Sequence, residues 1–375
     1  MKVMMIGCDL HDKSMLVKTA IDAKEQIGTR SFSNDPPGRH ELVVWLRERA
    51  EREGVERIVL AYEASGQGFG LCDLLTDHGI ECYVLAPTKM AVTPASRHRK
   101  TGERDALKIL EVLKGYVLAG NSLPSVCVPD RTLRDDRDLL RTRGDLVQKL
   151  TTVRTQVRTL LKRHDVRSPE GLGCGWTKAF ELWLSWLAGA GPHPLQPQRR
   201  DECSPLGPGA RAALVSLLRQ LEFLEEELSR VMAAIRKLAA SARYAPLVRE
   251  LTALEGVGLV TAMVFLTELG DPRRFRNRRQ VAAYFGLAPS SYESGTQDDR
   301  KGHITRQGSP RVRQVLCQAA WVRVQKHPGD RHWYERIKLK NPKKKKVAVV
   351  ALMRRLSVLM WHRSLEAAQR TSTAA

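Results

Sequence analysis

The sequence has no paired cysteines, no cluster of histidines and no long apolar run. Its seven cysteines stand singly, without a CxxC pair, and its ten histidines show no ligand spacing, which argues against a zinc ribbon. Single cysteines also favour a reducing cytoplasm over a secreted, disulfide-linked protein. The apolar start MKVMMIGC runs straight into Asp9 and a polar turn, so we expect neither a secretory signal nor a membrane span.

Acidic residues are also in short supply. The chain has 41 Asp and Glu against 62 Lys and Arg, which gives a formal net charge of +21. This surplus favours nucleic acid as a partner over a membrane surface, and a merely basic, ribosome-like protein is the alternative. With 375 residues, 42% of them hydrophobic, the chain can form two domains, or three if one is a long helical element.

The first third of the chain alternates short apolar runs with amphipathic segments. This alternation is typical of a layered α/β domain. We expect strands at 3–9, 14–21, 57–65 and 80–87, a last short strand at 125–130, helices at 39–53 and about 104–119, and a turn followed by a helix over 66–75.

Two long helical segments follow, at about 130–164 and 209–241. In the first, apolar residues recur every seven positions from Leu139 to Leu160. In the second, the spacing from Leu214 to Leu238 alternates three and four without a fault, which is the pattern of a coiled coil. The pattern fits an intramolecular helical hairpin and a dimerisation stalk equally well, and the two are compatible. Residues 166–208, rich in Pro, Gly and Trp, interrupt the helices.

Three carboxylates stand where a metal-dependent nuclease needs them. Asp9 and Glu63 end two of the predicted strands, and Asp105 opens a predicted helix. Mg²⁺ prefers oxygen ligands, and two such ions can hold a phosphodiester in line for displacement. Acidic residues at strand ends are often only solvated loop residues, so this pattern alone is a weak signal.

The C-terminal third contains a glycine turn between two apolar helical segments, in LTALEGVGLVTAMVFLTELGD (251–271). Gly256 and Gly258 allow backbone amides at a helix start to approach a DNA phosphate, as in a helix-hairpin-helix element, although a tight turn without a ligand has the same pattern. Residues 273–313 carry ten Lys and Arg against three Asp and Glu. The nucleic-acid contacts that we predict are Gly256, Gly258, Arg300, Lys301, Arg306, Arg311 and Arg313.

Within that basic stretch lies YFGLAPSSYESGTQ (284–297), where a serine stands beside a glycine. A serine hydroxyl among arginines can attack a phosphodiester, because the arginines stabilise the charge that develops on the phosphate. Taken alone, a Ser-Gly pair is almost always a turn.

The order of these segments resembles a known family. The stretches that carry the resemblance are IGCDLHDKS, AYEASGQGFGLCDLL, CYVLAPTKM, KTGERDA, LPSVCVPD, LTALEGVGLVTA, ELGDPRRF, AAYFGLAPSSYESG and GHITRQGSPRVRQVLCQAAW. In this order they resemble DEDD-type insertion-sequence transposases of the insertion-sequence 110 class, which includes Piv-like invertases and bridge-RNA-guided recombinases. The resemblance implies a RuvC-like, RNase H-type N-terminal domain that binds Mg²⁺, and a C-terminal domain that carries a nucleophilic serine.

Carried over residue by residue, the resemblance assigns the first two acids to Asp9 and Glu63 and the last to Asp105. The third acid of the family pattern falls on Gly102, and Glu103 is the candidate for a fourth ligand. The nucleophile falls on Ser294. Ser290 and Ser291 are its runners-up.

The resulting prediction combines an α/β domain with all-α regions. It has a RuvC-like domain at 1–128, coiled-coil helices at 129–246 and a transposase domain at 247–375. The predicted function is site-specific recombination of double-stranded DNA with Mg²⁺. The resemblance also implies a homodimer that assembles into a tetramer, and a guide RNA. A RuvC-like junction resolvase without serine chemistry and a degenerate nucleic-acid-binding protein are the alternatives.

Overall fold

The computed structural model divides the chain into two compact units, Met1–Pro129 and Asp130–Ala375. It describes residues 1–23, 28–90, 101–170, 172, 175–190, 194, 205–294, 297–342 and 345–373. Within these ranges, the side chains of 291–294, 297–301, 345 and 371–373 are outside the description.

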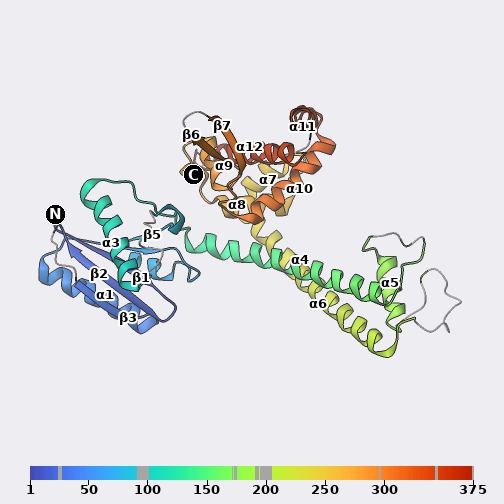
Figure 1. Ribbon diagram of the computed structural model, residues 1–375, viewed down its shortest axis with the longest axis horizontal. Helices are drawn as coiled ribbons and strands as arrows, with labels where there is room; N and C mark the ends of the chain where they lie inside the picture. The colour runs from blue at the N-terminus through green and yellow to red at the C-terminus, as the bar shows by residue number, and fades with distance from the viewer. Residues whose placement is uncertain are drawn as a thin grey trace. The chain divides into compact units, whose positions relative to one another are not determined.

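The first unit is a mixed α/β domain (Figure 1). Its strands are β1 (Val3–Leu10), β2 (Ser14–Ile21), β3 (Gly28–Ser33), β4 (Arg57–Glu63) and β5 (Glu81–Leu85). Its helices are α1 (Pro36–Glu53), α2 (Gly70–Asp77) and α3 (Gly102–Ala119), with a short 3₁₀ turn at Pro87–Lys89. The sheet order is β3-β2-β1-β4-β5, antiparallel from β3 to β1 and parallel from β1 to β5.

The central strand β1 is apolar along most of its length because helices cover both faces of the sheet. Met4, Ile6 and Cys8 pack in a cluster with residues of α1 and α2. Val3 and Met5 pack on the other face, in a cluster with residues of α3. The residues of β1 therefore alternate between two cores, and its odd-numbered positions face α3.

The predicted strands at 3–9, 14–21, 57–65 and 80–87 are confirmed, with shifts of a few residues at their ends. The predicted strand at 125–130 is wrong, because Ser125 makes only an isolated bridge to Leu85. The sequence pattern also missed β3, an edge strand in which only Phe32 is buried. One buried side chain in six residues leaves too little alternation for a strand to be recognised.

The described residues of the second unit are helical apart from one hairpin and short connecting segments. Its helices are α4 (Arg131–Arg163), α5 (Lys178–Leu187), α6 (Pro208–Ala239), α7 (Ala245–Thr252), α8 (Leu259–Leu269), α9 (Arg278–Tyr284), α10 (Pro310–Lys326), α11 (Pro328–Lys340) and α12 (Lys345–Thr373), with a 3₁₀ turn at Pro272–Arg274. The hairpin is formed by β6 (Pro289–Ser294) and β7 (Gln297–Ile304).

The long helices α4 and α6 pack against each other along their apolar stripes (Figure 1). Leu150, Val153 and Val157 of α4 share one cluster with Leu214 and Leu221 of α6. The heptad stripe of α6 therefore finds a partner helix within the same chain. A role of the same stripe in dimerisation stays a prediction.

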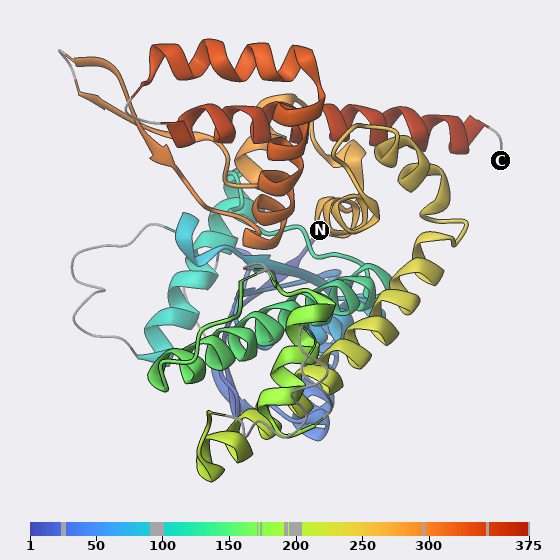
Figure 2. The same cartoon turned by 90° about the vertical axis from the view of Figure 1, so that its right-hand side faces the viewer.

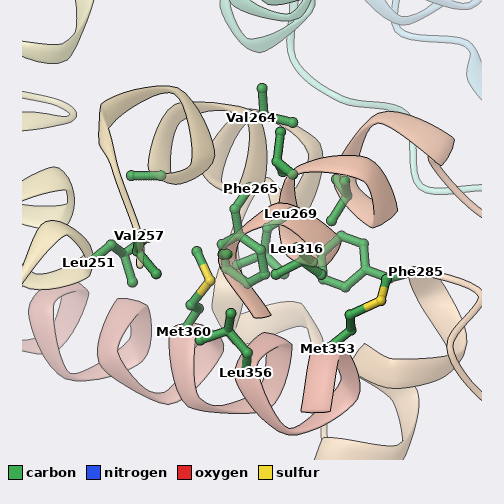
Figure 3. Packing of buried hydrophobic residues seen from close by; sticks show 14 of the residues in the cluster. Leu251, Val257, Val264, Phe265, Leu269, Phe285, Leu316, Met353, Leu356 and Met360 are labelled. Atoms are coloured by element: carbon green, nitrogen blue, oxygen red, sulfur yellow. The ribbon is translucent and has the colours of Figure 1, made fainter. Parts of the chain in front are cut away.

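The C-terminal helices surround one core of buried apolar side chains. Figure 3 shows Phe265 of α8, Phe285 at the end of α9 and Leu316 of α10 packed near Met353 and Met360 of α12. This core fixes the base from which the hairpin of β6 and β7 extends (Figure 2). No helix in the described part of the chain has both the length and the apolar composition that crossing a bilayer requires.

Candidate active site

Asp9 and Glu63 lie on the same face of the sheet, at the carboxyl ends of neighbouring parallel strands. The register pairs Cys8 with Tyr62, so the next residues along β1 and β4 stand side by side. Neighbouring strands are about 4.8 Å apart, which puts the two carboxylates within reach of one another. Cys8 and Tyr62 pack on the α1 and α2 side, and therefore Asp9 and Glu63 face α3.

Helix α3 reaches this end of the sheet because Gly7 lets its backbone approach β1. A Cβ atom at Gly7 would lie 2.2 Å from the carbonyl oxygen of Ala106 and 2.4 Å from the amide nitrogen of Leu110. One turn before this contact, the helix begins at Gly102, beside Asp9. Asp105 is three residues further on and shares the sheet-facing side of α3.

The Asp9 carboxylate is largely buried and has an unusual environment. The Nε2 atom of His11 lies 2.9 Å from its Oδ2 atom. The Oδ2 atom nevertheless has no hydrogen bond within the described residues, so the contact with His11 lacks the geometry of one. A buried carboxylate oxygen without a hydrogen bond fits a position where a cation binds.

Gly102, the residue on which the third acid of the family pattern is predicted to fall, lies beside Asp9. A Cβ atom there would lie 2.7 Å from Asp9 Oδ2. The neighbouring Glu103 turns elsewhere, and its Oε2 atom lies 3.3 Å from the Nζ atom of Lys18 on β2. Lys18 also donates a hydrogen bond to the Thr29 hydroxyl, over 2.7 Å. The role of Glu103 as a fourth ligand stays a prediction.

In the described part of the chain, no three His, Cys, Asp or Glu side chains are close enough together to hold a metal ion. The structure thus brings Asp9, Glu63 and the start of α3 to the same end of the sheet, but their carboxylates are not close enough together to coordinate one ion. Their roles as metal ligands stay predictions.

The turn that carries His11 is fixed to the loop that follows Glu63. The side-chain amide nitrogen of Asn34 donates to the backbone oxygen of His11 over 2.6 Å and to the side-chain oxygen of Gln67 over 2.6 Å. Gln67 in turn donates to Asp12 over 3.0 Å. These hydrogen bonds hold the two loops around the acidic residues together.

Ser294 is the last residue of β6, where it pairs with Gln297 of β7. It therefore lies at the far end of the hairpin, although its side chain is outside the described residues, as is that of Ser291. The hydroxyl of the other runner-up, Ser290, donates to the backbone oxygen of His303 over 3.0 Å. Ser290 thus helps to hold the two strands together.

The base of this hairpin is packed tightly against the end of α9. Gly308 has a φ of 130°, and a Cβ atom there would lie 2.1 Å from the carbonyl oxygen of Tyr284. Arg313 donates to the carbonyl oxygens of Phe285 and Gly308, over 3.1 and 2.9 Å. Burial lowers the pKa of the Arg313 guanidinium. The hairpin therefore extends from a rigid base.

The turn at Gly256 packs against α10. Gly256 has a φ of 80°, and a Cβ atom there would lie 2.8 Å from the carbonyl oxygen of Ala319. Arg323 donates to the carbonyl oxygen of Glu255 over 2.9 Å and makes a buried ion pair with Asp330. Gly258, in contrast, is exposed at the start of α8. Gly258 is therefore the more exposed of the two glycines of the predicted turn.

The predicted phosphate-binding residues differ in what their side chains do. Arg311 pairs with Asp145 of α4 over 2.8 Å, and Arg313 holds backbone carbonyl groups as described above. Arg306 is exposed and has a φ of 55°. The side chains of Arg300 and Lys301 lie outside the described residues.

Comparisons with known proteins identify the family. A profile of the transposase IS116/IS110/IS902 family matches residues 248–335, and a transposase profile of the DEDD type matches residues 6–165. The protein called "Putative transposase y4qE" of Sinorhizobium fredii is 31% identical over 344 residues, which cover 84% of this chain and 78% of that protein. The chain belongs to the IS110 family of transposases. This transposase is therefore a DNA-recombining enzyme.

Two further relatives extend the comparison. A "Probable family 20 transposase" of Pseudomonas aeruginosa is 27% identical over 356 residues, covering 92% of this chain and 96% of that protein. A pilin gene-inverting protein of Moraxella bovis is 28% identical over 112 residues, covering 30% and 34%. The DEDD-type profile spans both strand ends and α3 of this transposase, and a domain of that type suggests a divalent metal ion as cofactor.

Proposed function

We propose that this transposase cuts and rejoins double-stranded DNA at the ends of an insertion sequence, with Ser294 as the nucleophile and Asp9, Glu63 and Asp105 as the acidic site. The observation that carries the proposal is the meeting of Asp9, Glu63 and the start of α3 at one end of one sheet face. The first unit then has the role of a RuvC-like nuclease domain, and residues 247–375 that of the serine-bearing domain.

Asp9, Glu63 and Asp105 are the residues that would hold Mg²⁺. Their carboxylate oxygens suit its preference for hard ligands, and waters and phosphate oxygens complete the coordination in sites of this kind. When bound, the ion supplies a positive charge that stabilises the charge developing on the phosphate. The chain itself contributes the fixed position of this site, through Gly7 and the hydrogen bonds that connect the loops around Asp9 and Glu63.

Ser294 would act by transesterification. Its Oγ atom forms a bond to the phosphorus of the scissile phosphodiester, the bond from phosphorus to the leaving sugar oxygen breaks, and the hydroxyl proton passes to that oxygen. The covalent serine–DNA link preserves the energy of the bond, so the reverse attack by a different DNA end rejoins the strands. Its place at the far end of the hairpin suits attack on a duplex that lies outside the protein.

The surface around α9 would supply contacts to the DNA backbone. Arg276, Arg278 and Arg279 are exposed at the start of this helix. They are better placed for phosphates than Arg311, whose guanidinium pairs with Asp145, and Arg313, whose guanidinium donates to backbone carbonyl groups. The backbone amides that follow the exposed Gly258 at the start of α8 are a further candidate contact.

A partner subunit and a guide RNA belong to the same proposal. Ser294 and the acidic residues lie in different units of the chain. The family resemblance implies that Ser294 of one subunit works with the acidic site of another, in a dimer or tetramer, and we include this arrangement in the proposal. The guide RNA rests on the family resemblance alone, and the net charge of +21 leaves ample positive surface for RNA as well as DNA.

The test is capture of the covalent intermediate. Purified full-length protein is incubated with element-end DNA, its guide RNA and Mg²⁺, and protein–DNA adducts are separated in denaturing gels. Ser294→Ala is expected to remove the adduct and to leave DNA binding within about twofold. Ser290→Ala is the matched control in the same strand and should keep the adduct. Adducts that survive Ser294→Ala and vanish in Ser290→Ala or Ser291→Ala would reassign the nucleophile. Cleavage that none of the three serine variants affects would favour the resolvase alternative.

Gly102 favours a second candidate function, that of a nucleic-acid-binding protein with reduced or no activity. A glycine supplies no oxygen ligand where the family pattern has an acid, right beside Asp9. In that case the wild type would bind element-end DNA without cutting it, and Gly102→Asp would raise cleavage. Restored cutting by Gly102→Asp from an inactive wild type would establish the degenerate function.

A further inference from the structure

The side chains around Asp9 suggest which residue replaces the missing acid. Position 102 is aimed at Asp9 Oδ2 but carries no side chain. Glu103, next to it, is engaged with Lys18. His11 approaches the same Oδ2 atom from the turn after β1, at 2.9 Å. Of these three residues, His11 is the one with a side-chain atom, Nε2, that already lies beside Asp9 Oδ2 and could bind a metal ion.

The separation of these two atoms matches that of two ligands on one ion. Neighbouring ligands around an octahedral ion at about 2.1 Å are roughly 3.0 Å apart, because the ligand–metal–ligand angle is a right angle. The observed separation of 2.9 Å agrees with this value. A simple ion pair at that distance normally contains a hydrogen bond, and Asp9 Oδ2 has none. The contact therefore has the spacing of shared coordination and lacks the direction of a hydrogen bond.

His11 is both fixed and accessible. Its backbone amide donates to Ser14 over 2.9 Å, and its backbone oxygen accepts from Asn34. Its side chain remains 62% exposed, so an ion can reach the imidazole without unfolding of the turn. The backbone of His11 is thus already ordered, and only its side chain has to be fixed when an ion binds.

We propose that His11 is a metal ligand in this transposase, and that its imidazole shifts the preference of the acidic site from Mg²⁺ towards divalent transition metals such as Mn²⁺. The physical reason is the donor type: Mg²⁺ favours oxygen ligands, whereas imidazole nitrogen favours first-row transition metals. The inference deepens the acidic site of the proposed function and rests on it. It does not depend on Ser294.

The experiment measures Mn²⁺ bound to the tag-free, full-length chain, with no DNA and no turnover. Affinity is read from the loss of the free Mn²⁺ signal in electron paramagnetic resonance, with Mg²⁺ as competitor. Pulsed measurements then report whether a ¹⁴N nucleus is coordinated to the ion. His11→Ala is compared with His40→Ala, which removes an exposed histidine of α1 in the same domain.

We expect wild type and His40→Ala to show ¹⁴N coordination and equal Mn²⁺ affinity. His11→Ala should lose the ¹⁴N signal and about tenfold in Mn²⁺ affinity, while Mg²⁺ competes more effectively. Adding Gly102→Asp to His11→Ala should raise Mg²⁺ affinity without restoring the ¹⁴N signal. A ¹⁴N signal that is absent from wild type or persists in His11→Ala overturns the inference.

One further variant separates this inference from the proposed function. Asp9→Asn should abolish Mn²⁺ binding. If Asp9→Asn binds Mn²⁺ as wild type does, the acidic site itself is wrong, and the proposed function loses its metal centre along with this inference. If Asp9→Asn abolishes binding but His11→Ala does not weaken it, only the role of His11 is wrong.

Discussion

Replacing Gly7 by Ala tests whether the approach of α3 to β1 builds the acidic site. The new Cβ atom would lie 2.2 Å from the carbonyl oxygen of Ala106 and 2.9 Å from the Cα atom of Leu110. Both are backbone atoms, so no side-chain rotation relieves the clash, and the helix has to move by roughly 1 Å to reach ordinary contact distances. Overpacking of this kind destabilises by about 1–3 kcal/mol. A shift of about 1 Å at the start of α3 should also lower metal-dependent strand cleavage by roughly 10²-fold.

The assay is hydrogen exchange of the full-length chain, followed in peptides from α3. A loss of about 1–3 kcal/mol in local stability corresponds to a roughly 5- to 150-fold faster exchange of the protected amides. Gly66→Ala is the matched control, because a Cβ atom there meets nothing within 4 Å. Equal exchange of α3 in Gly7→Ala and Gly66→Ala would refute the argument that Gly7 sets the position of the helix.

Two further predictions concern packing and pH. Leu221 of α6 is 4% exposed in the cluster between α4 and α6, so Leu221→Ala should destabilise by about 2–5 kcal/mol in denaturant unfolding, whereas Phe223→Ala, at a position 61% exposed, should have little effect. Equal effects would mean that the stripe of α6 packs elsewhere. Burial and the nearby Asp9 charge raise the pKa of the Cys8 thiol from 9.0 to about 12. The folded state thus keeps a proton that the unfolded chain loses, and stability should fall as pH rises from about 9 to about 12, less steeply in Cys8→Ala, as measured by thermal unfolding.

The fold of the first unit was predictable where the sequence shows strong periodicity. The continuous apolar run of β1 follows from its burial on both faces of the sheet. The alternation in the first part of β2 follows from burial on one face there. The edge strand β3 was not predicted, because Phe32 is its one buried residue. The hairpin of β6 and β7 was not predicted for a related reason. Its strands PSSYES and QDDRKGHI are polar, and the Ser-Gly pair at 294–295 was the signal of a turn between them.

The candidate site was predictable only in its residue types. Asp9, Glu63 and Asp105 could be named from strand ends and from the family resemblance, but their common location depends on the parallel register of β1 and β4. The contact between His11 and Asp9 had no separate signal, since a histidine directly after a strand is common. The structural role of Arg313 was equally hidden, because charge counting treats every arginine as a candidate for phosphate contact.

The ends of β1 and β4 and the start of α3 together form the proposed cation site of this transposase. Affinity cleavage tests it most directly: Fe²⁺ is exchanged into the full-length protein, and ascorbate with peroxide generates hydroxyl radicals that cut the backbone near the bound ion. We expect cuts near residues 9, 63 and 102–105, all suppressed together by excess Mn²⁺ or Mg²⁺ and all absent from Asp9→Asn. Cuts confined to one of these segments, or cuts that persist in Asp9→Asn, would contradict it.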